Sequence, residues 1–137
     1  MGGFEHIEHT ADVGIKAWDE TLEGCLEQAT LGVLDIMAAW RPGDTDETVP
    51  IEVSARDLGG VLVDWLSEVL YISESRDAVV TAIDIDSVTE TEARGTISIT
   101  ARDDEVLEGT AVKAVTYHQL DISPTDTGWA ATLIVDV

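Results

Sequence analysis

The chain has 137 residues, of which 45% are apolar, and its formal net charge is −21, from 28 acidic residues against 7 lysines and arginines. This length and apolar content suit one folded domain over residues 1–137 that needs no metal or disulfide to be stable. Because direct nucleic-acid binding relies on clustered lysine and arginine, the composition argues against a surface that contacts RNA or DNA.

Residues 13–18 alternate between apolar side chains and other residues, which predicts a strand. A helix is predicted over about residues 21–39, because apolar residues recur at helical spacing and Thr21 suits the N-cap position. The Arg-Pro-Gly segment at residues 41–43 is expected to end that helix. The only cysteine, Cys25, lies in the apolar pattern, where a small core residue is more common than a nucleophile.

A strand over residues 51–55 is followed by a second predicted helix over about residues 57–72, with Asp57 as its N-cap. Both helices carry apolar residues beside their main stripes, such as Leu31 and Val63, so each is expected to be covered on more than one side. Alternation predicts further strands over residues 79–85, 96–101, 112–122 and 129–137, with a hairpin loop over residues 123–128. Two helices among many short strands predict an α+β domain with a mostly antiparallel sheet.

The acidic residues are spread from Glu5 to Asp136, between apolar positions, instead of forming a tail. Self-repulsion at this charge destabilises a compact chain in dilute buffer, whereas molar salt shortens the Debye length to about 3 Å. The pattern therefore favours a salt-loving source. We expect a cytoplasmic protein, because no apolar run has the length of a membrane span and no signal peptide is recognisable.

Three side chains with metal affinity lie three residues apart near the N-terminus, at His6, His9 and Asp12. On a helix this spacing would share one face, but the local pattern is strand-like and points His6 and His9 to opposite sides. Histidines at the surface or partly buried, with Thr10 and Asp12 in a turn, are the preferred interpretation. A two-histidine metal site is the weaker alternative.

The last predicted strand ends in Asp136 and Val137 without a polar tail. Most termini fray unless they are tied down, so this apolar strand is expected to be held in the sheet. Asp136 and the α-carboxylate of Val137 would then lie close together, and Asp12 adds a third oxygen ligand suited to Ca²⁺ or Mg²⁺. The alternative is two solvated acids and a free terminus.

Lys113 is one of only two lysines and is expected in mid-strand among apolar neighbours. It could bridge acids or hold a carboxylate or phosphate of a partner, although a surface ion pair is the more ordinary interpretation. Tyr117 and His118, further along the same predicted strand, suit packing as well as chemistry.

Several enzyme signatures are absent from the sequence. There is no nucleophile elbow, phosphate-binding glycine loop, dinucleotide fingerprint or His-Glu-x-x-His zinc motif. Nothing points to a Ser–His–Asp triad, and the acids are too numerous for a catalytic pair to be singled out.

Several segments of the chain resemble the archease family in order and spacing, from near residue 4 to the end. They are residues 9–15 (HTADVGI), 57–58 (DL), 62–71 (LVDWLSEVLY), 112–118 (VKAVTYH) and 129–137, which end in IVDV. Each motif alone is modest, and together they are specific.

The resemblance implies a non-catalytic protein that activates the RtcB-type RNA ligase, which joins tRNA exons through a GMP-linked histidine. Archeases promote guanylylation of this ligase and its multiple turnover. The resemblance also implies two helices packed between sheet layers. The family's Ca²⁺ site, for which Mg²⁺ or Mn²⁺ are alternatives, maps onto Asp12, Asp136 and Val137, and its important lysine maps onto Lys113. Val137 is slightly smaller than the isoleucine with which the family often ends.

Two other functions stay open at this point. The first is a metal-dependent phosphohydrolase that uses the same acids with His9 or His118. The second is a general chaperone or protein-interaction module, whose activity would survive loss of Asp12 and Asp136.

Overall fold

The computed structural model describes residues 2–8, 12–103 and 109–137. Within these residues the chain forms two helices and seven strands. Their bounds in chain order are β1 Gly3–Glu8, β2 Asp12–Asp19, α1 Leu22–Ile36, β3 Glu47–Ser54, α2 Leu58–Ser75, β4 Ala78–Val88, β5 Glu92–Ala101, β6 Ala114–Thr125 and β7 Gly128–Asp136.

Helix α1 has a defined cap at each end. The Thr21 side chain accepts a hydrogen bond from the Gly24 amide at 3.0 Å, which confirms the predicted N-cap. At the other end Ala38 has φ +52°, and the Ala39 amide donates to the Leu34 carbonyl at 2.9 Å, as in a Schellman motif. This left-handed residue turns the chain away, so the helix ends three residues before the predicted limit.

Helix α2 begins as predicted, with the Asp57 side chain accepting a hydrogen bond from the Gly60 amide at 2.7 Å. It continues three residues beyond the predicted end. The extra turn is polar in sequence but is held by the buried Ser73 hydroxyl, which donates to the Ala78 carbonyl at 2.8 Å. Asp77, with φ +47°, ends the helix.

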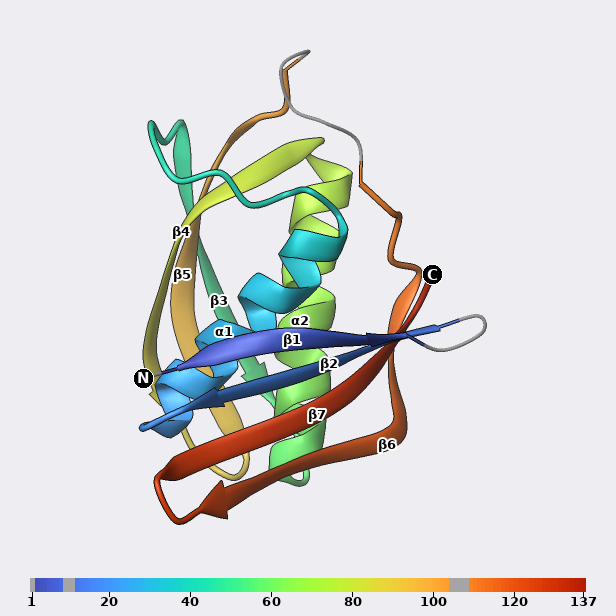
Figure 1. Ribbon diagram of the computed structural model, residues 1–137. Coiled ribbons are helices and arrows are strands. Elements are labelled where there is room, and N and C mark those ends of the chain that lie inside the picture. Colours follow the sequence, from blue (N-terminus) through green and yellow to red (C-terminus); the bar gives the residue numbers. More distant parts are fainter. Residues whose placement is uncertain (1, 9–11, 104–108) are drawn as a thin grey trace.

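The strands form two antiparallel sheets, which we call sheet A and sheet B. Sheet A has the order β1-β2-β7-β6, and sheet B has the order β3-β5-β4. In sheet A the early strand β2 pairs with the last strand β7 over its whole length, from Asp12 opposite Asp136 to Asp19 opposite Trp129. Figure 1 shows these blue and red strands side by side in front of the helices.

Both helices lie between the two sheets (Figure 1). Helix α1 contacts β2 of sheet A and β4 of sheet B, while α2 contacts β6 and β3. This double cover explains the wide apolar surfaces of both helices and confirms the predicted α+β arrangement. Among the described residues, no helix is long and apolar enough to cross a membrane.

A buried polar contact joins the two helices inside this core. The Trp65 indole is fully buried, and its Nε1–H donates to the Thr30 hydroxyl at 3.1 Å. That hydroxyl in turn donates to the Leu26 carbonyl of its own helix at 2.7 Å. The polar side-chain atoms at this position are therefore satisfied within the core.

The hairpin between β6 and β7 is tighter than the sequence predicted. Strand β6 continues to Thr125, so the turn contains only Asp126 and Thr127 instead of residues 123–128. Pro124, expected in the loop, pairs opposite Trp129 instead, which is tolerated because β6 is an edge strand.

Candidate functional site

Two predicted site residues meet at one end of sheet A. Asp12 is the first residue of β2, Asp136 is the last residue of β7, and the two are direct partners in the antiparallel register. Directly opposed residues point to the same face with Cβ atoms about 5 Å apart. Because Ile15 and Ala17 of β2 are buried toward the helices, the alternation places both carboxylates on the outer face of the sheet.

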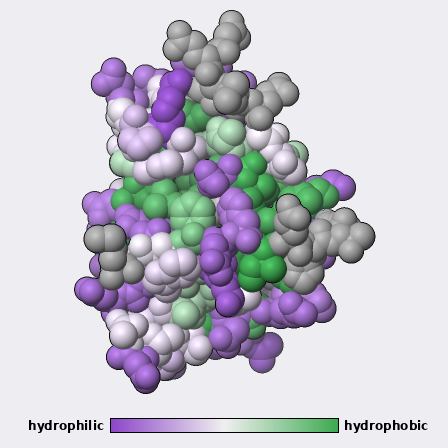
Figure 2. Space-filling model, in the orientation of Figure 1, coloured by the Kyte–Doolittle hydropathy of each residue, from purple (hydrophilic) through white to green (hydrophobic). Residues whose placement is uncertain are grey.

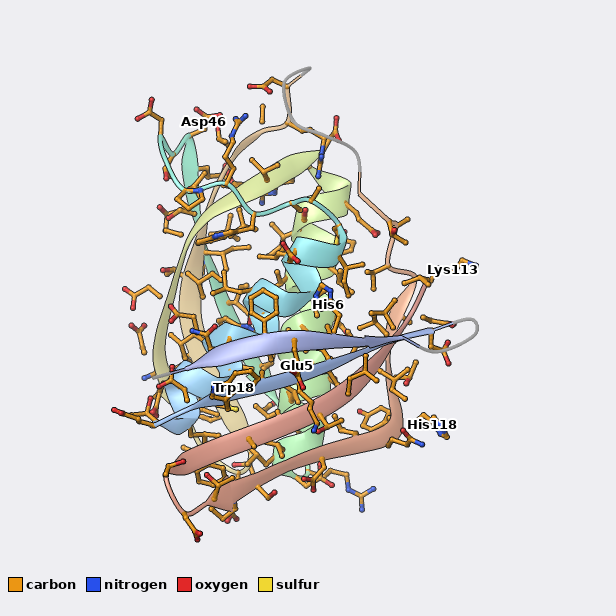
Figure 3. All side chains as sticks on the ribbon, in the orientation of Figure 1. Glu5, His6, Trp18, Asp46, Lys113 and His118 are labelled. Atoms are coloured by element: carbon orange, nitrogen blue, oxygen red, sulfur yellow. The ribbon has the colours of Figure 1, made fainter. Side chains whose placement is uncertain are left out.

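Strand β6 brings the predicted lysine to the same end. The Lys113 amide donates to the Asp136 carbonyl at 2.7 Å, and the next residue, Ala114, is the register partner of Asp136. The Lys113 side chain is exposed, and in Figure 3 it extends from the molecule beside the chain end. Within the part of the chain that the structure describes, Lys113 forms no ion pair, so the ordinary surface-pair interpretation finds no support.

Central strands hold this end of the sheet in place. Strands β2 and β7 each have a neighbour on both sides, and Leu133, Ile134 and Val135 of β7 are buried. Val137 follows β7 directly, is half-buried and packs against the core. The backbone at this end is therefore held by packing on its inner side and by the pairing of Asp136 with Asp12 on one edge and Ala114 on the other.

His6 does not belong to this site. It lies on β1 opposite Ile15, and its Nε2 is 3.3 Å from the Gly32 carbonyl and 3.7 Å from a carboxylate oxygen of Asp35, both on α1. His9, Thr10 and the rest of residues 9–11 lie outside the described residues. His6 therefore gives no support to the two-histidine metal site, the weaker of the two sequence interpretations.

The donor atoms of the site suit a hard cation. Asp12 and Asp136 offer carboxylate oxygens, the kind of donor that Ca²⁺ and Mg²⁺ bind. The described residues contain no group of three or more His, Cys, Asp or Glu side chains arranged to hold a metal.

Cys25 is a core residue, as its helical position suggested. It is fully buried, and its Sγ is 3.8 Å from the Ala17 carbonyl of β2. Burial, with a contribution from the Asp19 carboxylate, raises the pKa of the thiol from 9.0 to about 11. A thiol that stays protonated at neutral pH is a poor nucleophile.

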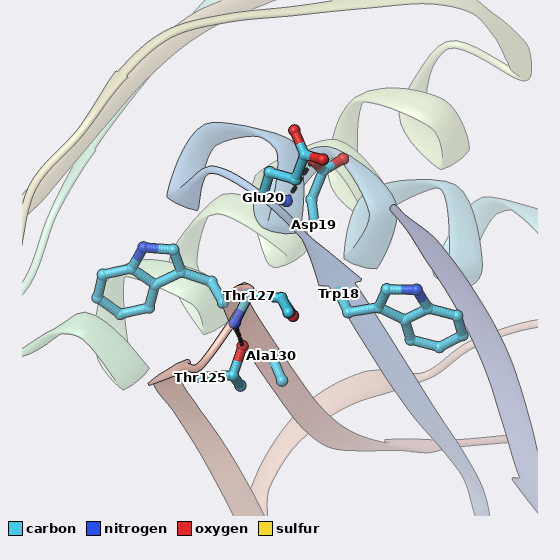
Figure 4. Close-up of a pocket in the computed structure, with 7 residues that line it drawn as sticks. Trp18, Asp19, Glu20, Thr125, Thr127 and Ala130 are labelled. Carbon is cyan, nitrogen blue, oxygen red and sulfur yellow. Dashed lines mark hydrogen bonds between the residues drawn. The ribbon is translucent and has the colours of Figure 1, made fainter. Parts of the chain in front are cut away.

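The opposite end of sheet A carries a hollow that the sequence did not reveal. A cavity of about 490 Å³ lies between the end of β2 and the β6–β7 hairpin, lined by Trp18, Asp19, Thr125 and Trp129 among others. Figure 4 shows Trp18 and Asp19 of β2 and Thr125 of β6 among the residues that line this hollow. Trp18 and Trp129 face opposite sides of the sheet, because Trp18 pairs with Ala130 and Asp19 with Trp129.

The face of the molecule seen in Figure 2 mixes hydrophilic and apolar surface. Figure 2 shows hydrophilic residues over much of this face, with apolar surface between them. In the sequence, the acidic residues behind the net charge of −21 are spread along the chain.

The fold and the paired carboxylates define a small two-sheet α+β protein with an acidic site at one sheet end. A family model described as the Archease protein family matches residues 4–137. The chain is 36% identical over 141 residues to protein archease of Methanosarcina barkeri, with 98% of this chain and 95% of that protein covered. It is 37% identical over 153 residues to protein archease of Saccharolobus islandicus, with both proteins covered completely.

Solved structures share the fold. The solution structure of protein 1598 from Methanobacterium thermoautotrophicum matches with a TM-score of 0.79 and 28% identity, covering 98% of this chain and 99% of that chain. A crystal structure from Thermotoga maritima, described as an archease and possible chaperone, has a TM-score of 0.61 at 21% identity, covering 96% and 94%. The chain belongs to the archease family.

Proposed function

We propose that this chain activates an RtcB-type tRNA-splicing RNA ligase as a non-catalytic protein cofactor. It would promote guanylylation of the ligase histidine and multiple turnover in the joining of tRNA exons. The proposal rests on the family and on one observation, the direct pairing of Asp12 with Asp136 at the sheet end that also carries Lys113.

The electrostatics of this pair support a role in binding. Like charges directly opposite each other on a sheet are destabilising, and here both lie on the outer face. A cation between them, or a cationic group of a partner, removes that repulsion. A folded protein that keeps such a pair exposed at the end of two central strands is suited to an interaction made outside its own chain.

We propose that the cation is divalent and most often Ca²⁺, held by Asp12, Asp136 and the Val137 carboxylate, with Mg²⁺ or Mn²⁺ as alternatives. When bound, it would supply positive charge that orders a phosphate or nucleotide. Lys113 would contact a carboxylate or phosphate at the ligase active site, since its ammonium group is exposed beside Asp136. The two carboxylates would position the cation.

Metal binding is measured separately from ligase activity. In concentrated KCl, equilibrium dialysis with ⁴⁵Ca²⁺ should show one site per chain, lost in Asp136→Asn. The matched control is Asp126→Asn, because Asp126 is an exposed acid in the turn at the other end of β7. Equal binding by both variants would refute the assigned ligands.

The functional test is GMP loading and multiple-turnover ligation by the RtcB-type ligase of the same organism, with and without this chain. Stimulation should be lost in Asp136→Ala and Lys113→Ala. It should persist in Asp126→Ala and in Lys16→Ala, which removes the other lysine of the chain, exposed on β2. No stimulation by the wild-type chain at any salt concentration would refute the proposal.

The same preparations separate the other interpretations. A phosphohydrolase would turn over a nucleotide or RNA without any ligase. A general chaperone, the function suggested in the description of the Thermotoga maritima protein, would suppress aggregation of unrelated proteins, and Asp136→Ala would keep that activity.

A further inference from the structure

Strand β6 carries a large bulge that no part of the proposed site uses. Thr116 pairs with Ile134, and the next pair is Asp121 with Thr132. Four residues, 117–120, therefore stand opposite the single residue Leu133. Bulges of this kind re-aim side chains and concentrate beside functional sites.

The bulge is held at both ends by specific contacts. The Thr116 hydroxyl donates to the Ile134 carbonyl at 3.0 Å and accepts from the His118 amide at 3.3 Å. Gln119 has φ +54°, a left-handed conformation that is costly without glycine. Leu120 turns back toward the core and packs over Gly59 of α2.

The result is a fixed loop that presents an aromatic ring to solvent. Tyr117 is 64% exposed, so most of its side chain faces solvent. His118 is also exposed, and Figure 3 shows it leaving the molecule on the same side as Lys113.

Tyr117 forms one wall of a hollow of about 420 Å³ between the bulge and the start of α2. The apolar floor of the hollow is made by Leu58, Leu120 and Ile122, and two acids, Asp57 and Asp121, lie at its rim.

Each rim acid has one oxygen in a local hydrogen bond. Asp57 accepts from the Gly60 amide and Asp121 from the Ser123 hydroxyl. Arg56, the neighbour of Asp57 in the sequence, is not among the residues that line this hollow; it lines an adjoining one, to which Asp57 and Glu90 also belong. The hollow thus combines an aromatic wall, an apolar floor and negative charge.

We propose that the β6 bulge is a second contact for the ligase, with the hollow beside Tyr117 receiving an arginine side chain of that protein. This inference rests on the proposed function. An arginine stem would lie on the apolar floor, its guanidinium would stack on the Tyr117 ring, and its charge would face Asp57 and Asp121.

The same charge argues for a protein occupant and against RNA. Phosphates would meet two carboxylates here, on a chain of net charge −21. An arginine on a protein surface meets complementary charge, and tyrosine is among the residues that dominate binding at such contacts.

The two contacts fit one interface. Lys113 directly precedes β6, outside the strand where the sequence predicted it, and Tyr117 is four residues further on, so at no more than about 3.6 Å per residue their Cα atoms lie within roughly 14 Å of each other. A single partner of ordinary footprint, about 800 Å² per side, covers both.

The test measures binding of the intact chain to the purified ligase by fluorescence anisotropy, and stimulation of GMP loading in parallel. Tyr117→Ala should weaken binding about tenfold. Tyr117→Phe keeps the ring and should bind within twofold of wild type. The matched control is Tyr71→Ala, because Tyr71 is 66% exposed on α2 and far from the bulge in sequence. Asp121→Asn should weaken binding about threefold, and less so in higher salt.

The outcomes separate the two proposals. If wild-type chain stimulates the ligase but Tyr117→Ala and Tyr71→Ala behave alike, the second contact is refuted and the activator function stands. If wild-type chain neither binds nor stimulates the ligase, both are refuted. A Tyr117→Ala defect in binding labelled tRNA-half RNA without ligase would also overturn the inference, in favour of an RNA contact. Thermal melting of each variant in the same salt confirms that the fold is intact.

Discussion

Replacing Thr30 with valine tests whether the polar link between the helices stabilises the fold. The change removes the hydroxyl that accepts from the Trp65 indole at 3.1 Å, at a position with no exposed surface. One buried hydrogen bond contributes about 1 kcal/mol net, and a stranded buried donor costs about 1–3 kcal/mol. The extra buried methyl group of valine contributes about 0.8 kcal/mol in the opposite direction. We therefore expect the free energy of unfolding to fall by about 2 kcal/mol.

Urea unfolding at fixed high salt, followed by tryptophan fluorescence, measures the loss as a lower midpoint at unchanged slope. Thr30→Ser keeps the hydroxyl and should lose only about 1 kcal/mol, the value of one methyl group. Thr48→Val is the exposed control, since the Thr48 hydroxyl also has a partner, Ser98 at 3.3 Å, and should change stability by less than about 0.5 kcal/mol.

A double-mutant cycle with Trp65→Phe isolates the interaction. In the Thr30→Val background the Trp65 indole N–H has already lost its acceptor, and phenylalanine removes that unpaired donor. The Trp65→Phe change should therefore cost about 1 kcal/mol less of unfolding free energy there than in the wild-type background. A Thr30→Val loss below about 0.5 kcal/mol, or additive single and double variants, would show that the contact does not stabilise the protein.

Single structural features lead to four further predictions. Ala38→Gly should stabilise the fold by about 1 kcal/mol in urea unfolding, because Ala38 holds a left-handed conformation. Gly128→Ala should destabilise it by at least about 2 kcal/mol, because φ is +151° and the new Cβ would overlap the Asp19 carbonyl oxygen; a neutral result would contradict the hairpin geometry. The raised pKa of Cys25 means that the folded chain binds this proton more tightly than the unfolded chain, so the unfolding free energy should fall as pH rises from about 9 to about 11, and Cys25→Ala should remove that component. Raising KCl from 0.15 M to 2 M should increase the melting temperature, because salt screens the repulsion between the acids; a decrease would argue against that repulsion as the main effect of salt on stability.

Local rules predicted the starts of the helices well. Thr21 and Asp57 cap α1 and α2 as expected, because capping depends on residues within one turn. The helix ends were less predictable, since Ala38 and Asp77 adopt left-handed conformations without the glycine that usually signals one. Tertiary contacts set those ends.

The local sequence pattern could not predict that the residues of the candidate site are neighbours. Asp12 and Asp136 are more than 120 residues apart, and only the β2–β7 pairing makes them neighbours. The sequence offered hard oxygen ligands at the two ends of the chain as one possible site, with two solvated acids as the alternative, and the family resemblance favoured the shared site. The bulge was missed for a related reason: alternation predicted one strand over residues 112–122, and it carries no information about the partner strand, where Leu133 alone faces four residues.

The position of β7 between β2 and β6 has a consequence for how the protein folds. Strand β7 is the last strand in the chain, yet it lies in the interior of sheet A. Its pairing with β2 joins residues far apart in sequence, so this part of the sheet should form late in folding. The paired carboxylates exist only once that pairing is complete. A chain in which β7 is missing or unpaired would therefore lack the paired carboxylates. The acidic pair is present only in a fully folded chain.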